Sequence, residues 1–193
     1  MNDFQLYIEM GLKHVLDFSA YDHILFLAAL SVVFTIKQWK KVLWLVTLFT
    51  VGHSVTLALS AYNILNIDVA LIEFLIPVTI FLTAVFNIIN AIRNTENSND
   101  INLIFALFFG LIHGLGFSNY FRMMIGKEEN KLMPLIEFAL GIELAQVIIV
   151  LAILTIGYVF QQYIKLKKQY WVIATSIFIL FISAKMMWER VFW

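Results

Sequence analysis

The segment GLKHVLDFSAY at Gly11–Tyr21 returns as GLIHGLGFSNY at Gly110–Tyr120, and this pair of segments organises the chain. Gly, Leu, His, Leu, Phe, Ser and Tyr occupy the same offsets in both segments, although the chain contains only 4 histidines. A weaker similarity links FTVGHS at Phe49–Ser54 with FALGIE at Phe138–Glu143. Because the matches keep their order along the chain, they predict an internal repeat.

Composition places these segments in a membrane. Hydrophobic residues make up 62% of the 193-residue chain and charged residues 13%, whereas a soluble domain is roughly half apolar and a quarter charged. The net charge of zero and the lack of a basic block argue against a nucleic-acid partner. The absence of cysteine excludes disulfides, thiolate metal sites and cysteine nucleophiles. We therefore expect an integral membrane protein surrounded by a lipid bilayer.

A membrane-spanning helix needs about 20 mostly apolar residues, and six stretches qualify. They are Tyr21–Ile36 extended backward by GLKHVLDF, Val42–Ile64, Val69–Ile92, Ile101–Phe121, Met133–Ile164 and Tyr170–Val191. A polar loop at Arg93–Asp100 divides the chain near its middle. The prediction is an all-α, polytopic membrane helix bundle that forms one integral membrane domain, residues 1–193, with half-repeats 1–92 and 101–193. Three spans per half would invert the second half relative to the first, as in transporters built from inverted repeats.

The Lys and Arg residues of the short loops predict the orientation. One set of alternate loops contains Lys37, Lys40, Lys41, Arg93, Lys165, Lys167 and Lys168. The opposite set contains Arg122, Lys127 and Lys131, diluted by Glu128 and Glu129. We therefore expect the first set in the cytoplasm, with both termini outside.

All four histidines, and several carboxylates, fall within or beside the predicted spans. Such groups cost about 2.5–3.5 kcal/mol each at membrane depth, so they usually mark a site or a pathway. Imidazoles and carboxylates without thiols suit Ni²⁺, Co²⁺, Zn²⁺ or Fe²⁺. With the predicted orientation, six of these residues can meet in the outer half of the bundle: His14, Asp22, His53, Glu73, His113 and Glu143. The candidate metal ligands are His14, Asp22, His23, His53, His113 and Glu143, and the candidate residues supporting them are Asp17, Ser54, Glu73, Asn87 and Gln146.

The first span must break if its two histidines are to share one ion. At 100° per residue, His14 and Asp22 lie about 80° apart, but His14 and His23 point to opposite sides of one helix. We therefore expect a break near Phe18–Ala20, as found at transporter sites. In the third span, Pro77 predicts a kink that exposes the carbonyl of Glu73, four residues earlier.

Two functions fit such a site. One is a secondary permease for a divalent transition metal, without ATP drive of its own because the chain has no Walker motif. The other is an intramembrane metal-dependent hydrolase with an open catalytic metal site, Glu143 or Asp17 as general base, and a lipid or other apolar substrate. A metal sensor, a chaperone-like partner of a metalloenzyme, and histidines that only join helices remain as alternatives.

Four motifs carry a family resemblance: HVLDFSAYDHILF at His14–Phe26, FTVGHSVTL at Phe49–Leu57, FGLIHGLGFS at Phe109–Ser118 and FALGIELAQ at Phe138–Gln146. With these motifs the chain resembles the HupE/UreJ family over most of its length. The resemblance implies a bacterial inner-membrane protein of a nickel or cobalt permease type, associated with metalloenzyme maturation for hydrogenase or urease. It also implies that His14, Asp22, His23, His53 and His113 handle the ion. The spacing from His14 to Asp22 is longer than in the related nickel–cobalt permeases, and no leader peptide is evident.

Overall fold

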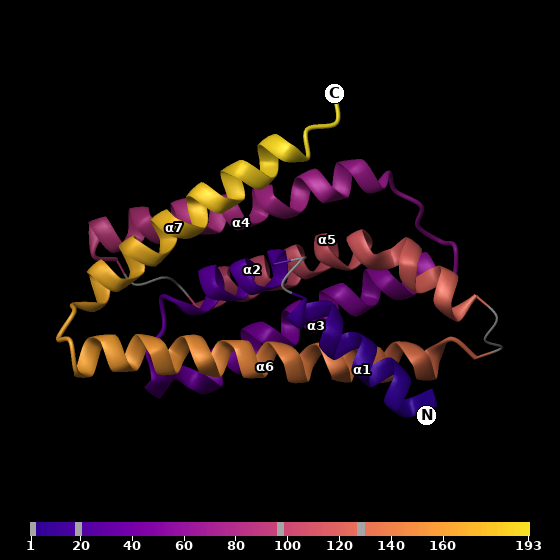
Figure 1. Ribbon diagram of the computed structural model, residues 1–193, viewed down its shortest axis with the longest axis horizontal. Coiled ribbons are helices and arrows are strands. Elements are labelled where there is room, and N and C mark those ends of the chain that lie inside the picture. The colour runs from indigo at the N-terminus through magenta and orange to yellow at the C-terminus, as the bar shows by residue number, and fades with distance from the viewer. Residues whose placement is uncertain (1–2, 18–20, 96–98, 127–129) are drawn as a thin grey trace.

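The computed structural model describes residues 3–17, 21–95, 99–126 and 130–193, and these residues form helices without strands. The elements are α1 (Asp3–Leu16), α2 (Asp22–Ser31), the short 3₁₀ helix η1 (Ile36–Gln38), α3 (Trp39–Ala61), α4 (Val69–Arg93), α5 (Asn99–Ile125), α6 (Leu132–Gln162) and α7 (Lys168–Glu189) (Figure 1). The prediction of an all-α bundle is confirmed.

Five of these helices, α3 to α7, are long and apolar enough to cross a membrane. Their bounds differ from the predicted spans by a few residues; α3, for example, covers Trp39–Ala61 where Val42–Ile64 was expected. The protein is therefore a polytopic membrane protein, and hydropathy located most of its spans because each needs an apolar run of nearly fixed length.

The first predicted span consists of two short helices. Helix α1 ends at Leu16 and α2 begins at Asp22, while the predicted break at Phe18–Ala20 lies outside the described residues. Helix α2 has 10 residues, which is too few to cross a membrane. It ends at Ser31, short of the predicted Ile36. Beyond it, the side chain of Gln38 accepts a hydrogen bond from the Thr35 backbone N–H at 3.0 Å and caps the start of η1.

The helices pack in three groups, and α2 lies in the central one. Helix α4 lies along α7 at one side and α1 along α6 at the other, with α2, α3 and α5 between them (Figure 1). Eight residues of α2 are buried, and a helix that is apolar on all sides belongs in the interior of a bundle. The start of α2 is therefore held at the centre of the protein.

Two glycine pairs bring helices into close contact. Gly11 on α1 meets Gly141 on α6, and a Cβ on Gly11 would clash with the carbonyl of Phe138. Gly110 on α5 meets Gly52 on α3, and a Cβ on Gly110 would clash with the carbonyl of Phe49. The glycines and phenylalanines of the two crossings occupy equivalent positions in the repeated motifs. Small residues allow such close backbone approach. The half-repeats 1–92 and 101–193 and their inverted relation stay predictions.

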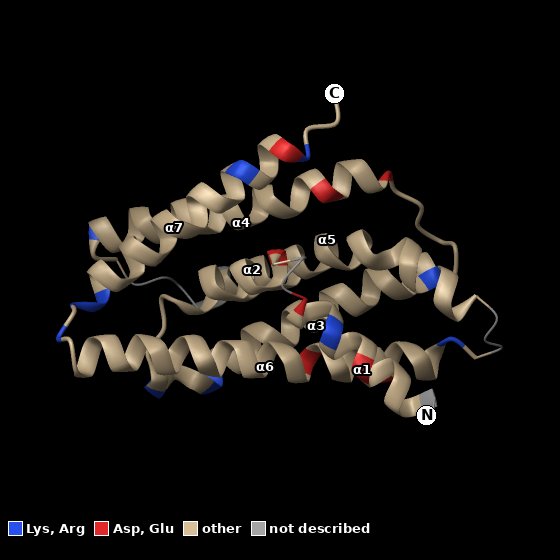
Figure 2. Cartoon of the chain, in the orientation of Figure 1, with Lys and Arg blue, Asp and Glu red and all other residues tan. Residues whose placement is uncertain are grey.

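Polar and apolar side chains are distributed as a lipid environment requires. Large apolar side chains on α3 to α7, among them Val51, Leu82, Phe108, Ile148 and Phe181, are exposed. Figure 2 shows that charged residues are sparse along the middle of these helices and that Lys and Arg gather at the ends, above all at the end where α7 begins. That basic end contains the loop lysines that predicted the orientation; the side of the membrane that it faces stays a prediction.

Candidate metal centre

The four histidines converge from four helices. His14 lies in the last turn of α1 and His23 in the first turn of α2, while His53 and His113 lie within α3 and α5. The ring centroid of His14 lies 4.6 Å from that of His23 and 5.7 Å from that of His53. The centroid of His113 lies 5.4 Å from that of His23. The separation of α1 from α2 makes this possible, because one continuous helix would direct His14 and His23 to opposite sides.

Three of these rings form a potential ligand set. One ring nitrogen from each of His14, His23 and His53 can be chosen so that the three atoms lie within 4.8 Å of one another. A metal–nitrogen bond of about 2.0–2.1 Å puts the ligand nitrogens of a tetrahedral ion about 3.4 Å apart. Small side-chain rotations would therefore bring the three nitrogens onto one ion. His113 and the predicted ligands Asp22 and Glu143 are outside this group of described residues.

Hydrogen bonds determine which nitrogen is available on two of the rings. Nδ1 of His113 lies 2.9 Å from the carbonyl oxygen of Phe109, and Nδ1 of His23 lies 3.1 Å from Oδ1 of Asp22. A carbonyl and a carboxylate only accept, so both Nδ1 atoms donate and both Nε2 atoms carry a lone pair. Metal-binding imidazoles are held by partners of this kind.

The available nitrogens have no hydrogen-bond partner among the described residues. Nε2 of His14, His23 and His113 and both ring nitrogens of His53 are buried and unpaired. Leaving a buried polar group unpaired costs about 1–3 kcal/mol, so their accumulation in one place calls for a ligand. Neutral imidazoles are good ligands for Ni²⁺, Co²⁺, Zn²⁺ and Fe²⁺, and the nitrogen-rich donor set fits such an ion.

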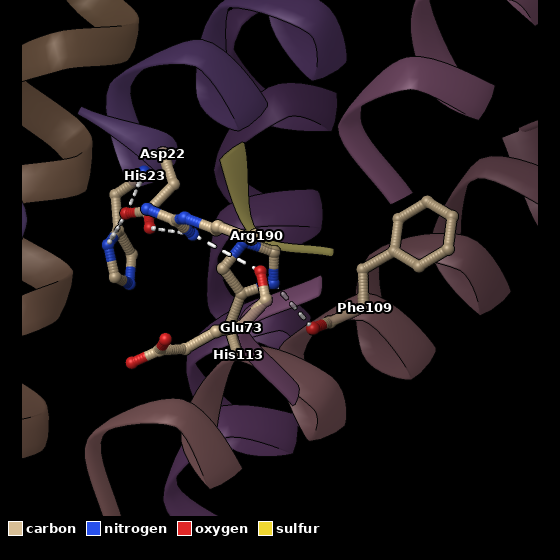
Figure 3. A network of polar contacts seen from close by, with 6 residues as sticks. All are labelled: Asp22, His23, Glu73, Phe109, His113 and Arg190. Atoms are coloured by element: carbon tan, nitrogen blue, oxygen red, sulfur yellow. Dashed lines mark hydrogen bonds and ion pairs between the residues drawn. The ribbon is translucent and has the colours of Figure 1, made fainter. Parts of the chain in front are cut away.

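The carboxylate of Asp22 supports His23 from behind. Its Oδ1 accepts hydrogen bonds from the His23 backbone N–H at 2.9 Å and from the ring, while Oδ2 pairs with Nη1 of Arg190 at 3.5 Å (Figure 3). The Asp22 side chain is thus engaged with the outer nitrogen of the ring and with an arginine. In this structure the Asp22 carboxylate holds the His23 ring, and direct coordination of an ion by Asp22 stays a prediction.

Arg190 is a site residue that sequence reasoning missed. It follows the end of α7, and its Nη1 also donates to the backbone carbonyl of Glu73 at 3.3 Å (Figure 3). That carbonyl lacks its usual helical donor because Pro77, four residues later, has no N–H. Glu73 therefore contacts Arg190 through its backbone while its side chain is exposed, and its supporting role at a metal site stays a prediction. The only sequence feature that could have pointed to Arg190 was its position as a lone arginine after the last span, where other cationic residues are few.

Glu143 lies between α3 and α6 and is held by threonines. Its Oε1 accepts a hydrogen bond from Thr47 at 2.6 Å, and its Oε2 accepts one from Thr50. The Thr50 hydroxyl is also 3.0 Å from Oε1 of Gln146, whose Nε2 is buried without a partner. Thr50 precedes His53 by one helical turn on α3. This polar cluster therefore lies beside His53, and Glu143 is outside the group of histidine nitrogens that could share an ion.

The remaining predicted supporting residues are Asn87, Asp17 and Ser54. Asn87 donates from Nδ2 to the carbonyl of Ala29 at 2.7 Å and ties α4 to α2. Asp17 is exposed just beyond α1, and Ser54 is partly buried on α3 next to His53. Two other predicted supporting residues contact predicted ligands indirectly. Glu73 is linked to Asp22 through Arg190, and Gln146 is linked to Glu143 through Thr50.

Aromatic rings cover the side of the histidines that faces the basic end. Phe26, Phe49 and Phe109 each lie about one helical turn from a histidine, in the direction of that end. The rings of Phe26 and Phe49 stack with centroids 4.9 Å apart, and Phe109 meets Phe26 edge-on at 5.6 Å. All three side chains are buried. We call them the phenylalanine layer; it separates the histidine cluster from the basic end.

The fold and the site define a class: a polytopic helical membrane protein with a buried cluster of histidines where the short helices α1 and α2 meet α3 and α5. The sequence profile described as HupE / UreJ protein matches residues 1–190, and the chain belongs to this family. The sequence resemblance is thereby confirmed. Neither a curated protein nor a solved structure matches the chain.

Proposed function

We propose that this protein is a membrane permease for a divalent transition-metal ion of the nickel or cobalt class. The observation that carries the proposal is the set of ring nitrogens from His14, His23 and His53, gathered within 4.8 Å and buried without partners. Family membership points the same way, because HupE/UreJ proteins are proposed nickel or cobalt carriers. The metal ion is then the cargo, and the histidines are its binding site.

The arrangement of the four histidines suits a transient site. His14, His23 and His53 come from the first half of the chain, and His113 comes from the second half across the centre of the bundle. An ion that enters from the side of the termini would exchange its water ligands for these imidazole nitrogens. Movement of one half against the other would then change the distance from His113 to the other three rings and loosen the site, as in transporters whose site lies between repeats.

The phenylalanine layer serves as the closed inner barrier in this proposal. Phe26, Phe49 and Phe109 fill the space between the histidines and the basic end, so the ion cannot pass until these rings separate. We place the basic end in the cytoplasm of a bacterial inner membrane, with both termini outside, because short cytoplasmic loops are enriched in Lys and Arg. Metalloenzyme maturation partners would receive the ion there.

A metal-dependent hydrolase is the second candidate, and the phenylalanine layer is the observation that favours it. A site sealed on one side suits catalysis on an apolar substrate that enters from the lipid. The general base is harder to supply. Glu143 is engaged by Thr47 and Thr50, and its carboxylate is not among the ligand atoms that gather with the rings. We therefore favour the permease.

Uptake by proteoliposomes tests the proposal. The purified chain, reconstituted in vesicles with a metal-sensitive dye inside, should admit Ni²⁺ or Co²⁺, and His53→Ala should reduce the rate to that of empty vesicles. Ser183→Ala is the matched control, since Ser183 is a buried polar residue whose hydroxyl donates to backbone carbonyls of its own helix. Tight stoichiometric metal without uptake would overturn the permease and favour the hydrolase.

A further inference from the structure

A polar cavity of about 300 Å³ opens at the basic end of the bundle. It lies where the α2–η1 turn, the start of α3, the end of α4 and the start of α7 meet. Lys41 of α3 and Lys168 of α7 line it, together with the side-chain amides of Gln38, Asn94 and Gln169. The described lining contains no acidic residue, and its two lysines and several side-chain amides can donate hydrogen bonds to whatever enters.

A second, mainly apolar cavity of about 150 Å³ adjoins the first. The two cavities share Phe34 and Lys41, and the second continues along Trp44, Leu45 and Leu103 between α3 and α5. The Trp44 side chain is 67% exposed and faces the surroundings of the bundle. A cationic compartment therefore continues directly into an apolar groove at the protein surface.

An unpaired donor lies in the wall of the apolar groove. Asn102 of α5 is 8% exposed, and its Nδ2 is buried with no hydrogen-bond partner among the described residues. Such a group costs about 1–3 kcal/mol unless an acceptor reaches it. The occupant of the groove is therefore expected to combine an apolar surface with a hydrogen-bond acceptor.

The charges in the wall distinguish this site from a metal route. A divalent cation would be repelled by Lys41 and Lys168, whereas an anion would be attracted. Further lysines at the same end, including Lys37 and Lys40, extend the positive potential. Basic pockets between transmembrane helices bind anionic lipid headgroups, and the adjoining apolar groove favours a lipid over a small free anion.

We propose that the joined cavities bind one anionic phospholipid. Lys41 and Lys168 hold its phosphate, an acyl chain lies along Trp44, Leu45 and Leu103, and the Asn102 amide donates to an ester carbonyl. The bound lipid joins α3 to the α4–α7 pair at the end where Gln169 already donates to the carbonyl of Ala91 at 3.0 Å. This site does not depend on metal transport, because it rests on residues outside the histidine cluster.

Native mass spectrometry of the full chain in detergent tests the site. With phosphatidylglycerol and phosphatidylcholine as competing probes, we expect one phosphatidylglycerol retained at least fivefold over phosphatidylcholine. Lys41→Gln with Lys168→Gln should reduce that ratio to about one, while Lys41→Arg with Lys168→Arg should preserve it. Asn102→Leu should weaken phosphatidylglycerol retention although it changes no charge.

Lys37→Gln with Lys40→Gln is the matched control, because both residues are exposed lysines of the same end that line neither cavity. This pair should keep the wild-type preference. The proposal is overturned if the control loses the preference as fully as the Lys41/Lys168 pair, since the effect is then general surface charge. It is also overturned if glycerol 3-phosphate displaces phosphatidylglycerol at equal concentration, since the site then binds a small anion.

Discussion

The carboxylate of Asp22 accepts a hydrogen bond from Nδ1 of His23 over 3.1 Å, so that the Nε2 lone pair of His23 is left for an ion. Partners of this kind contribute about 10–100-fold to metal affinity. We expect Asp22→Ala to weaken Ni²⁺ or Co²⁺ binding by that factor without abolishing it, because the three imidazoles remain. Titration of the purified protein measures the change. A loss as complete as that of His23→Ala would mean that Asp22 coordinates the ion directly.

Arg190 acts on the site through Asp22, so its removal should have a smaller effect. Arg190→Gln leaves the Asp22–His23 hydrogen bond in place but removes the ion pair to Oδ2 and the donor to the Glu73 carbonyl. We expect metal affinity to fall less than in Asp22→Ala, and the double variant to lose little more than Asp22→Ala alone. Additive losses in the same titration would contradict a pathway through Asp22.

The glycine crossings predict paired effects on stability. Gly11→Ala and Gly110→Ala each place a methyl group against the carbonyl of an equivalent phenylalanine, and overpacking of this kind costs about 1–3 kcal/mol. Both variants should lower the thermal midpoint in detergent by similar amounts. Gly116→Ala on α5 is the control, because its Cβ would meet side-chain methyl groups of Ile76 and Ile72 and no backbone carbonyl. Unequal losses from Gly11 and Gly110 would argue against equivalent half-repeats.

The phenylalanine layer predicts a leak when it is thinned. Phe49→Leu retains an apolar side chain but removes the ring that stacks on Phe26 at 4.9 Å. If the layer is the inner barrier of a permease, Ni²⁺ or Co²⁺ should cross vesicle membranes faster in this variant, while metal affinity changes little. An unchanged flux together with unchanged binding would remove the layer from the transport path.

Hydropathy and residue rarity predicted much of this structure. The spans followed from apolar length, and the histidines stood out because ionisable groups are costly in a membrane. The separation of His14 from His23 into two helices followed from helical geometry. Each of these inferences rests on residue type and on spacing along the chain, which the sequence itself contains.

Tertiary partners were less predictable. Thr47 and Thr50 engage Glu143 across 96 and 93 residues, and Arg190 reaches Asp22 across 168 residues. Threonine is common in membrane helices, and an arginine after a final span is an ordinary boundary residue, so neither type indicated a contact. The separate hydrogen-bond partners of Asp22 and Glu143 could therefore be found only once the helices were placed around them.

Metal content and affinity of the purified full chain test the central claim most directly. Elemental analysis and titration should find one Ni²⁺ or Co²⁺ per chain, and X-ray absorption should find imidazole nitrogens around it. His14→Ala, His23→Ala and His53→Ala should each lower the metal affinity by more than the factor of about 10–100 expected for a residue that only hydrogen-bonds to a ligand. Ser183→Ala should leave the affinity unchanged. If these three variants bind the ion as the wild type does, the histidine cluster is not the metal site.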